Sequence, residues 1–207
     1  MTTQTASTRL LLTRIPDSWA WVRTDILIRL VPFTAVYAIA YRISGGGGGW
    51  LGLGVGNVAA QLVFALIAAP VMFAAAAWVQ LRLTRRRGAL SVPAAAGDAW
   101  FQAAFYALNG PIEEAFFRGL MQGGIGHLWG PAVGFALATP IYVVYHRLGR
   151  WPWPDTFATA LVGIPFGIAF WLLPGPASLL GVSLAHIGAT CGFLGPGPYL
   201  LRKMRFI

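Results

Sequence analysis

The chain has 207 residues, of which 57% are hydrophobic and only 10% carry a charged side chain. A water-soluble domain has about 25% charged residues, so this composition excludes an ordinary soluble protein. The single cysteine, Cys191, also excludes a framework of internal disulfides and the paired-cysteine metal sites.

Long charge-free runs indicate helices that cross a membrane. A helix of about 20 apolar residues spans the hydrocarbon core, and continuous apolar runs favour helices over the alternating strands of a β-barrel. We therefore predict an all-α bundle of about six transmembrane helices, forming one integral-membrane domain over residues 1–207. The expected spans, in chain order, are Ile26–Ile43, Gly54–Leu81, Trp100–Met121, Leu128–His146, Phe157–Leu173 and Ala177–Phe193.

The segments between these spans differ in charge. Basic residues gather before the first span and after the second, fourth and sixth, whereas the alternate loops contain no Lys or Arg. Because cytoplasmic loops are enriched in Lys and Arg, we expect both termini to be cytoplasmic. The net charge of +9 reflects this orientation better than it reflects nucleic acid, which we do not expect as a partner. The Ala-, Gly- and Arg-rich composition favours a prokaryotic plasma membrane.

Two basic residues lie inside the first span. Arg29 is expected to reach the membrane interface from a position near the end of the span, and Arg42, at its far end, is the one exception to the charge pattern. Residues 88–100 are expected to form a cytoplasmic loop, with room for an interfacial helix.

Five ionisable residues lie deeper in the expected spans, where each costs roughly 2.5–3.5 kcal/mol to insert. They come from three helices and are Glu113, Glu114, Arg118, His146 and His186. The two glutamates are the only ones in the chain, so their placement side by side calls for a functional or structural reason.

Helical geometry separates the two glutamates. Glu114 and Arg118 share a face, with the acid in the favoured N-terminal position for an ion pair. Glu113 points about 100° away and cannot use the same arginine. We therefore expect Glu113 to be the working group and the other two residues to support it, in a helix that Gly110-Pro111 kinks or restarts. A purely structural network of the three is the alternative.

Each of the two histidines has a polar or aromatic residue four positions away: Tyr142 precedes His146, and Thr190 follows His186. A neutral histidine can bind a metal, relay a proton or donate to an oxyanion. A histidine that is merely satisfied by a backbone carbonyl is the structural alternative. His127, in an opposite loop, is expected to be structural.

Three motifs, in this order, resemble the CAAX protease and bacteriocin-processing family of intramembrane, glutamic-type proteases, which includes the type II CAAX prenyl endopeptidases. "EEAFFR" fits the family's EExxxR, "YVVYH" fits FxxxH with Tyr142 for Phe, and "HIGAT" resembles HxxxN with Thr190 for Asn. The resemblance covers roughly residues 100–193, which we take as the catalytic part. Thr190 replaces an amide by a shorter hydroxyl, so an oxyanion contact from this position is weaker or differently aimed.

The resemblance implies an endopeptidase that acts on a membrane-associated protein or peptide, prenylated or carrying a sorting tail. It assigns activation of the attacking water to Glu113, positioning of that water to His146 and stabilisation of the oxyanion to His186. The supporting residues that it implies are Glu114, Arg118, Tyr142 and Thr190.

Zinc is the alternative to a glutamate mechanism, since two histidines and a glutamate can form a three-ligand site. The chain lacks HExxH, however, and Arg118 competes for Glu114, the base that would remain. We therefore expect no metal cofactor. The rival functions are a catalytically silent scaffold or immunity protein and, less favoured, a proton-coupled transporter, whose internal repeats and paired broken helices the sequence lacks.

Overall fold

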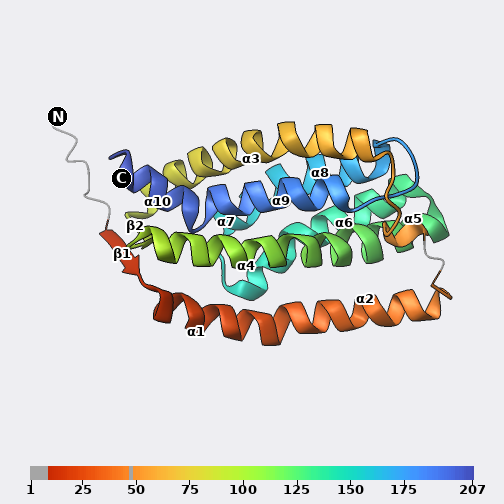
Figure 1. Ribbon diagram of the computed structural model, residues 1–207, viewed down its shortest axis with the longest axis horizontal. Helices are drawn as coiled ribbons and strands as arrows, with labels where there is room; N and C mark the ends of the chain where they lie inside the picture. The colour runs from red at the N-terminus through yellow and green to blue at the C-terminus, as the bar shows by residue number, and fades with distance from the viewer. Residues whose placement is uncertain (1–8, 47–48) are drawn as a thin grey trace.

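The computed structural model describes residues 9–46 and 49–207, and helices make up most of them (Figure 1). This helical content confirms the all-α class, whereas the number of six membrane spans stays a prediction. In chain order the elements are β1 (Arg9–Thr13), α1 (Ile15–Asp25), the π-helix η1 (Ile26–Leu30), α2 (Val31–Ile43), the 3-10 helix η2 (Gly49–Leu51), α3 (Val58–Arg87), β2 (Ala89–Pro93), α4 (Ala96–Glu114), the π-helix η3 (Ala115–Gly123), α5 (Gly124–Trp129), α6 (Pro131–Tyr145), the 3-10 helix η4 (His146–Gly149), α7 (Trp153–Ala158), α8 (Ala160–Leu172), α9 (Leu180–Phe193) and α10 (Pro196–Lys203).

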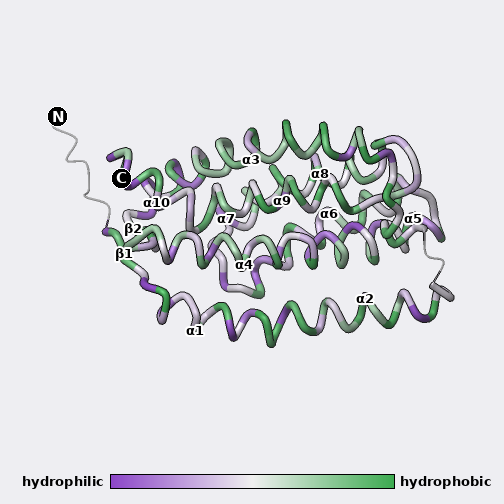
Figure 2. The backbone as a smooth tube through the Cα atoms, viewed as in Figure 1, coloured by the Kyte–Doolittle hydropathy of each residue, from purple (hydrophilic) through white to green (hydrophobic). Residues whose placement is uncertain are grey.

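Three helical stretches of the described residues are long and apolar enough to cross a membrane: Ile15–Ile43, Val58–Arg87 and Trp153–Leu172. Large apolar side chains cover their outer faces, as shown by Leu66, which is 74% exposed. Figure 2 shows hydrophobic residues along most of α3 and α9. Apolar surface of this extent requires lipid as its solvent, so the fold is that of an integral membrane protein.

The first helix is longer than predicted. It begins at Ile15 rather than Ile26, because α1, η1 and α2 follow one another without a break. Polar residues such as Arg23 and Asp25 interrupt the apolar run in the sequence and led to the later predicted start. The extension moves Arg29 from the predicted end of the span to the middle of the helix.

Residues 88–100 do not form the expected loop. Ala89–Pro93 is strand β2, which pairs in parallel with β1 in the register Arg9↔Ala89 to Thr13↔Pro93, and α4 begins at Ala96. Two five-residue strands so far apart in the chain leave little local sequence signal, since each is stabilised by the other. β1 and the C-terminus lie at the same end of the bundle (Figure 1).

Helix α9, which carries His186, packs along both α3 and α4. Glycines on one face of α9 allow its backbone to touch α3 directly. A Cβ at Gly188 would lie 2.4 Å from the carbonyl oxygen of Ala69, and one at Gly192 would lie 2.2 Å from that of Phe73. Close approach through small residues is the usual way in which membrane helices associate. The glycine row therefore fixes the position from which His186 reaches α4.

Replacing Gly188 by Ala tests this packing. We expect Gly188→Ala to destabilise the protein by about 1–3 kcal/mol, because backbone atoms cannot move aside for the added methyl group. The midpoint of thermal unfolding in detergent measures the loss. Gly97→Ala is the control: a Cβ there meets only the tip of Ile15, at 3.9 Å, so its midpoint stays unchanged or rises. A normal midpoint for Gly188→Ala would contradict the close helix contact.

Candidate active site

The two glutamates end helix α4, which continues directly into the π-helix η3. Pro111 lies inside α4, so the helix does not restart at Gly110-Pro111 as expected. Neighbouring helices can compensate for the hydrogen bond that a proline removes from a membrane helix. The geometry changes only after Glu114, where the hydrogen bonding widens to the π form, a rare arrangement that is frequent at functional sites.

Glu113 is 3% exposed, but it is not the unpaired carboxylate that the sequence predicts. Arg29 donates from Nη1 to its Oε1, and the Tyr145 hydroxyl donates to the same oxygen. Its other oxygen, Oε2, lies 3.6 Å from Nε2 of His186. One oxygen of Glu113 is therefore anchored, and the other faces a histidine.

Arg29 reaches Glu113 because it lies in the middle of the first helix, within η1. The expectation that it extends to the membrane interface is therefore wrong. Asp25, one turn earlier, holds the guanidinium through a 2.8 Å bond from Nε and a second bond from Nη2. A planar guanidinium bound at two points has a fixed direction, so Asp25 orients Arg29 toward Glu113.

Three residues of this arrangement were not predicted from the sequence to belong to the site: Asp25, Arg29 and Tyr145. The spacing of the first two gave a signal, since an acid four residues before an arginine forms a favourable helical pair. Tyr145 lies inside "YVVYH", but the FxxxH motif has its aromatic residue at the position of Tyr142 and none specified at that of Tyr145.

Glu114 and Arg118 form the ion pair that their spacing predicts, with Nε of Arg118 3.4 Å from Oε2 of Glu114. Both side chains are completely buried. The guanidinium of Arg118 lies over the Tyr142 ring, 4.9 Å from its centroid, in a cation–π contact. Its Nη1 also makes long hydrogen bonds to Gln122 and Thr139. The pair thus ties the end of α4 to α6.

His186 lies between the two glutamates. Its Nδ1 donates to Oε1 of Glu114 over 2.6 Å, and its Nε2 faces Glu113. The predicted partner, Thr190, lines the same cavity, but the hydrogen bond goes to Glu114 instead. A carboxylate bound to one ring nitrogen fixes the orientation of the imidazole and leaves the other nitrogen for chemistry.

His146 begins η4 at the end of α6. Its Nδ1 lies 2.9 Å from the carbonyl oxygen of Tyr142. Because a carbonyl only accepts, Nδ1 carries the hydrogen, and Nε2 of the neutral ring is an acceptor. The carbonyl contact considered as the structural alternative is thus present at one nitrogen, while Nε2 stays available.

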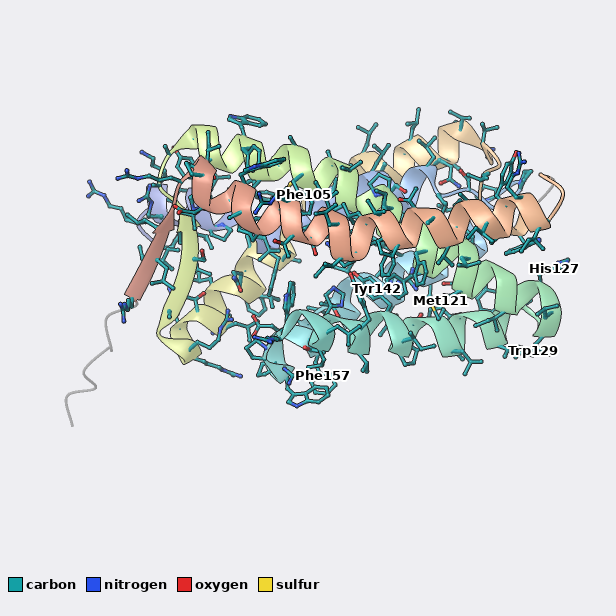
Figure 3. All side chains as sticks on the ribbon, turned by 90° about the horizontal axis from the view of Figure 1, so that it is seen from below. Phe105, Met121, His127, Trp129, Tyr142 and Phe157 are labelled. Carbon is teal, nitrogen blue, oxygen red and sulfur yellow. The ribbon has the colours of Figure 1, made fainter. Side chains whose placement is uncertain are left out.

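Glu113, His146 and His186 line a single cavity of about 600 Å³, together with Tyr142 and Thr190. Most of the remaining wall is apolar and aromatic; it includes Ile28, Phe33, Met72, Val79, Phe105, Trp151, Leu161 and Phe193. Tyr142 lies near mid-length of the bundle, whereas His127 and Trp129 lie at the end away from the strands (Figure 3). His127 stacks on Trp50 with ring centroids 5.9 Å apart.

The cavity extends from Glu113 toward the end of the bundle that carries β1 and β2. On α4 the lining residues precede Glu113, starting at Phe105, and on α9 they follow His186 as far as Leu194, just beyond its end. Helix α4 runs away from the strand end and α9 runs back toward it (Figure 1). Both series of residues therefore lead from Glu113 and His186 to the same end.

Two features of the site bear on the zinc alternative. Among the residues that the structure describes, no three His, Cys, Asp or Glu side chains are grouped so that they could hold a metal ion. In addition, the Arg29 cation is bound to Glu113, and its charge would repel a second cation at that carboxylate.

Comparison with known proteins bears on the segment that holds these residues. A family model described as "Type II CAAX prenyl endopeptidase Rce1-like" matches residues 95–191, which include all three motifs. The resemblance that the motifs indicate is therefore confirmed, and it indicates a protease. No curated protein and no solved structure matches the chain. Asp25 and Arg29 lie outside the matched segment.

The buried ion pair gives a testable consequence. We expect Arg118→Met to destabilise the protein by about 3–5 kcal/mol, because it leaves the charge of Glu114 buried with fewer partners. The midpoint of thermal unfolding in detergent measures the effect. Arg42→Met, which removes an exposed arginine from α2, serves as control and should leave the midpoint unchanged. Equal midpoints for the two variants would show that Glu114 does not depend on Arg118.

Proposed function

We propose that the protein is an intramembrane endopeptidase in which Glu113 activates the water that hydrolyses a peptide bond. Its substrate is a membrane-associated protein or peptide, with prenylated and sorting-tail peptides as the leading classes. One observation carries the proposal: Glu113, His146 and His186 converge from three helices on one cavity, within a segment that matches a protease family.

In the proposed reaction, water bound at Oε2 of Glu113 gives a proton to this carboxylate as its oxygen bonds to the peptide carbonyl carbon. The carbonyl oxygen then carries a negative charge. When the C–N bond breaks, Glu113 passes the proton to the leaving nitrogen, so that a carboxylic acid and an amine are formed. Anchoring of Oε1 by Arg29 and Tyr145 supports this role because it aims Oε2 at the water.

The two histidines assist in different ways. The free Nε2 of His146 accepts a hydrogen bond from the water and orients it. Protonated His186 donates from Nε2 to the oxyanion, and the Glu114 carboxylate at its Nδ1 balances the imidazolium charge. Glu114 and Arg118 hold the end of α4 in place. Thr190 supplies a further hydroxyl to the cavity.

We favour a metal-free mechanism. Arg29 already neutralises the charge of Glu113, and Arg29 and Tyr145 together orient its carboxylate, which a zinc-bound carboxylate would not require. In the zinc alternative, Glu114 would have to replace Glu113 as the base, but Glu114 is held by His186 and Arg118.

The direction of the cavity suggests the route of the substrate. The cavity leads toward the end of the bundle where basic residues gather, including those that end α3 and α10. By the positive-inside rule this end faces the cytoplasm, so we infer entry from the cytoplasmic leaflet, with both termini on the same side, in a prokaryotic plasma membrane.

The family match does not favour a silent scaffold or a transporter.

The test compares the termini of membrane proteins and peptides in cells that carry the wild-type protein or its Glu113→Gln form. Termini present only with the wild type are expected, because the variant keeps the shape of the side chain but cannot accept the proton. Mass spectrometry identifies the termini and thereby the cleavage motif. Identical termini, with both proteins equally abundant and folded, would contradict proteolysis by Glu113.

Isolated membranes extend this test to the metal question. Formation of the wild-type-only termini should continue when a zinc chelator is added, because the proposed mechanism needs no metal. Loss of these termini with the chelator, and their recovery after zinc is returned, would replace the glutamate mechanism by the zinc alternative.

A further inference from the structure

Asn109 is a buried polar residue that has no role in the proposed reaction. It is 4% exposed, lines the cavity, and its Oδ1 has no hydrogen-bond partner among the described residues. Burial of an amide without a partner costs free energy. Such a residue in a cavity wall points to a ligand that completes its hydrogen bonds.

A second buried amide on α4, Gln102, differs from Asn109 in its hydrogen bonding. Gln102 is also buried, but its Nε2 donates to Ser18 over 2.9 Å and to Asp98 over 3.2 Å. Its Oε1 accepts from the Tyr106 hydroxyl. Gln102 does not belong to the lining of the cavity. The structure therefore satisfies this buried amide outside the cavity, whereas Oδ1 of the amide in the cavity wall is left without a partner.

The position of Asn109 relates it to the path of a substrate. It lies one helical turn before Glu113, on the same face of α4 and toward the end of the bundle to which the cavity extends. Helices α4 and α9 run in opposite directions (Figure 1). Since Glu113 meets His186, the residue one turn after His186, Thr190, lies at about the level of the residue one turn before Glu113, Asn109. A chain that enters from the strand end must pass these two residues before it reaches Glu113.

We propose that the Asn109 carboxamide binds the backbone of an extended substrate segment next to the bond that Glu113 hydrolyses. In an extended chain the N–H and C=O of one residue point to the same side. A carboxamide has one carbonyl acceptor and one NH₂ donor, so it pairs with both once rotation about the Cβ–Cγ bond turns the buried Oδ1 toward the cavity. This contact holds the peptide in the extended form and sets its position along the cavity; the inference rests on the proposed function.

The test uses a synthetic peptide that carries the cleavage sequence found with the wild-type protein, and purified enzyme in detergent. Asn109→Leu keeps the approximate shape of the side chain and removes both hydrogen-bonding groups. We expect kcat/KM to fall about 10- to 100-fold, mainly through a higher KM. The midpoint of thermal unfolding should stay or rise, because an unpaired buried amide is lost. Gln102→Leu should show the opposite: a lower midpoint with KM unchanged.

N-methylated peptides test the contact itself. Methylation of one backbone nitrogen removes the N–H that pairs with Asn109, so at one position it should raise KM for the wild type. The same methylation should cause no further loss with Asn109→Leu, since paired groups do not contribute independently. Any of three results would overturn the inference. Asn109→Leu could lower the midpoint of thermal unfolding, or it could leave kcat/KM unchanged. N-methylation could also raise KM equally for the wild type and Asn109→Leu at every peptide position.

The Glu113→Gln variant separates this inference from the proposed function. If it cleaves the peptide as fast as the wild type, or if the wild type cleaves nothing, the proposed function fails and the inference fails with it. If cleavage depends on Glu113 but no N-methyl position couples to Asn109, only the inference fails.

Discussion

Burial of two adjacent carboxylates in an apolar bundle is the constraint on which the rest of the structure depends. An unpaired buried charge costs several kcal/mol, so Glu113 and Glu114 each need a positive or hydrogen-bonding partner. Since neighbouring helical residues point in different directions, one partner cannot serve both. Arg29 comes to Glu113 from the first helix, and Arg118 comes to Glu114 from the next turn of the same helix. His186 contacts both and links them to α9.

The two arginines share an unusual backbone setting. Arg29 lies in η1 and Arg118 in η3, both of which are π-helical. A π-helical turn holds more residues than an α-helical one, so it changes the direction in which the following side chains point. Departures from ideal geometry are expected where a charged group must meet a partner inside a membrane. Both π-helical segments therefore carry an arginine that pairs with one of the two glutamates.

The sequence identified several residues that the structure brings together, while their catalytic roles stay predictions. A carboxylate, an arginine or a histidine inside an apolar run is costly, so Glu113, Glu114, Arg118, His146 and His186 stood out, and the family match covers all five. The Glu114–Arg118 pair followed from helical spacing, because it depends on neighbours in one helix. The helical class followed from the long apolar runs.

Contacts between distant segments could not be predicted in this way. Arg29 meets Glu113 only because the first helix starts at Ile15, and no local pattern places that helix beside α4. Thr190 was a plausible partner for His186 by spacing, but Glu114 from another helix takes its place. The parallel strands β1 and β2 are likewise stabilised by pairing across most of the first half of the chain. Asn109 carries no charge, so nothing in its sequence context distinguished it.

The most direct test of this account is a double-mutant cycle between Arg29 and Glu113, measured as thermal unfolding in detergent. Arg29→Gln alone should destabilise the protein, because it leaves the Glu113 charge buried without its cation. Combination with Glu113→Gln should recover part of that loss, with a coupling free energy of about 0.5–3 kcal/mol. Strictly additive effects would contradict the claim that Arg29, from outside the family-matched segment, holds Glu113 in the site.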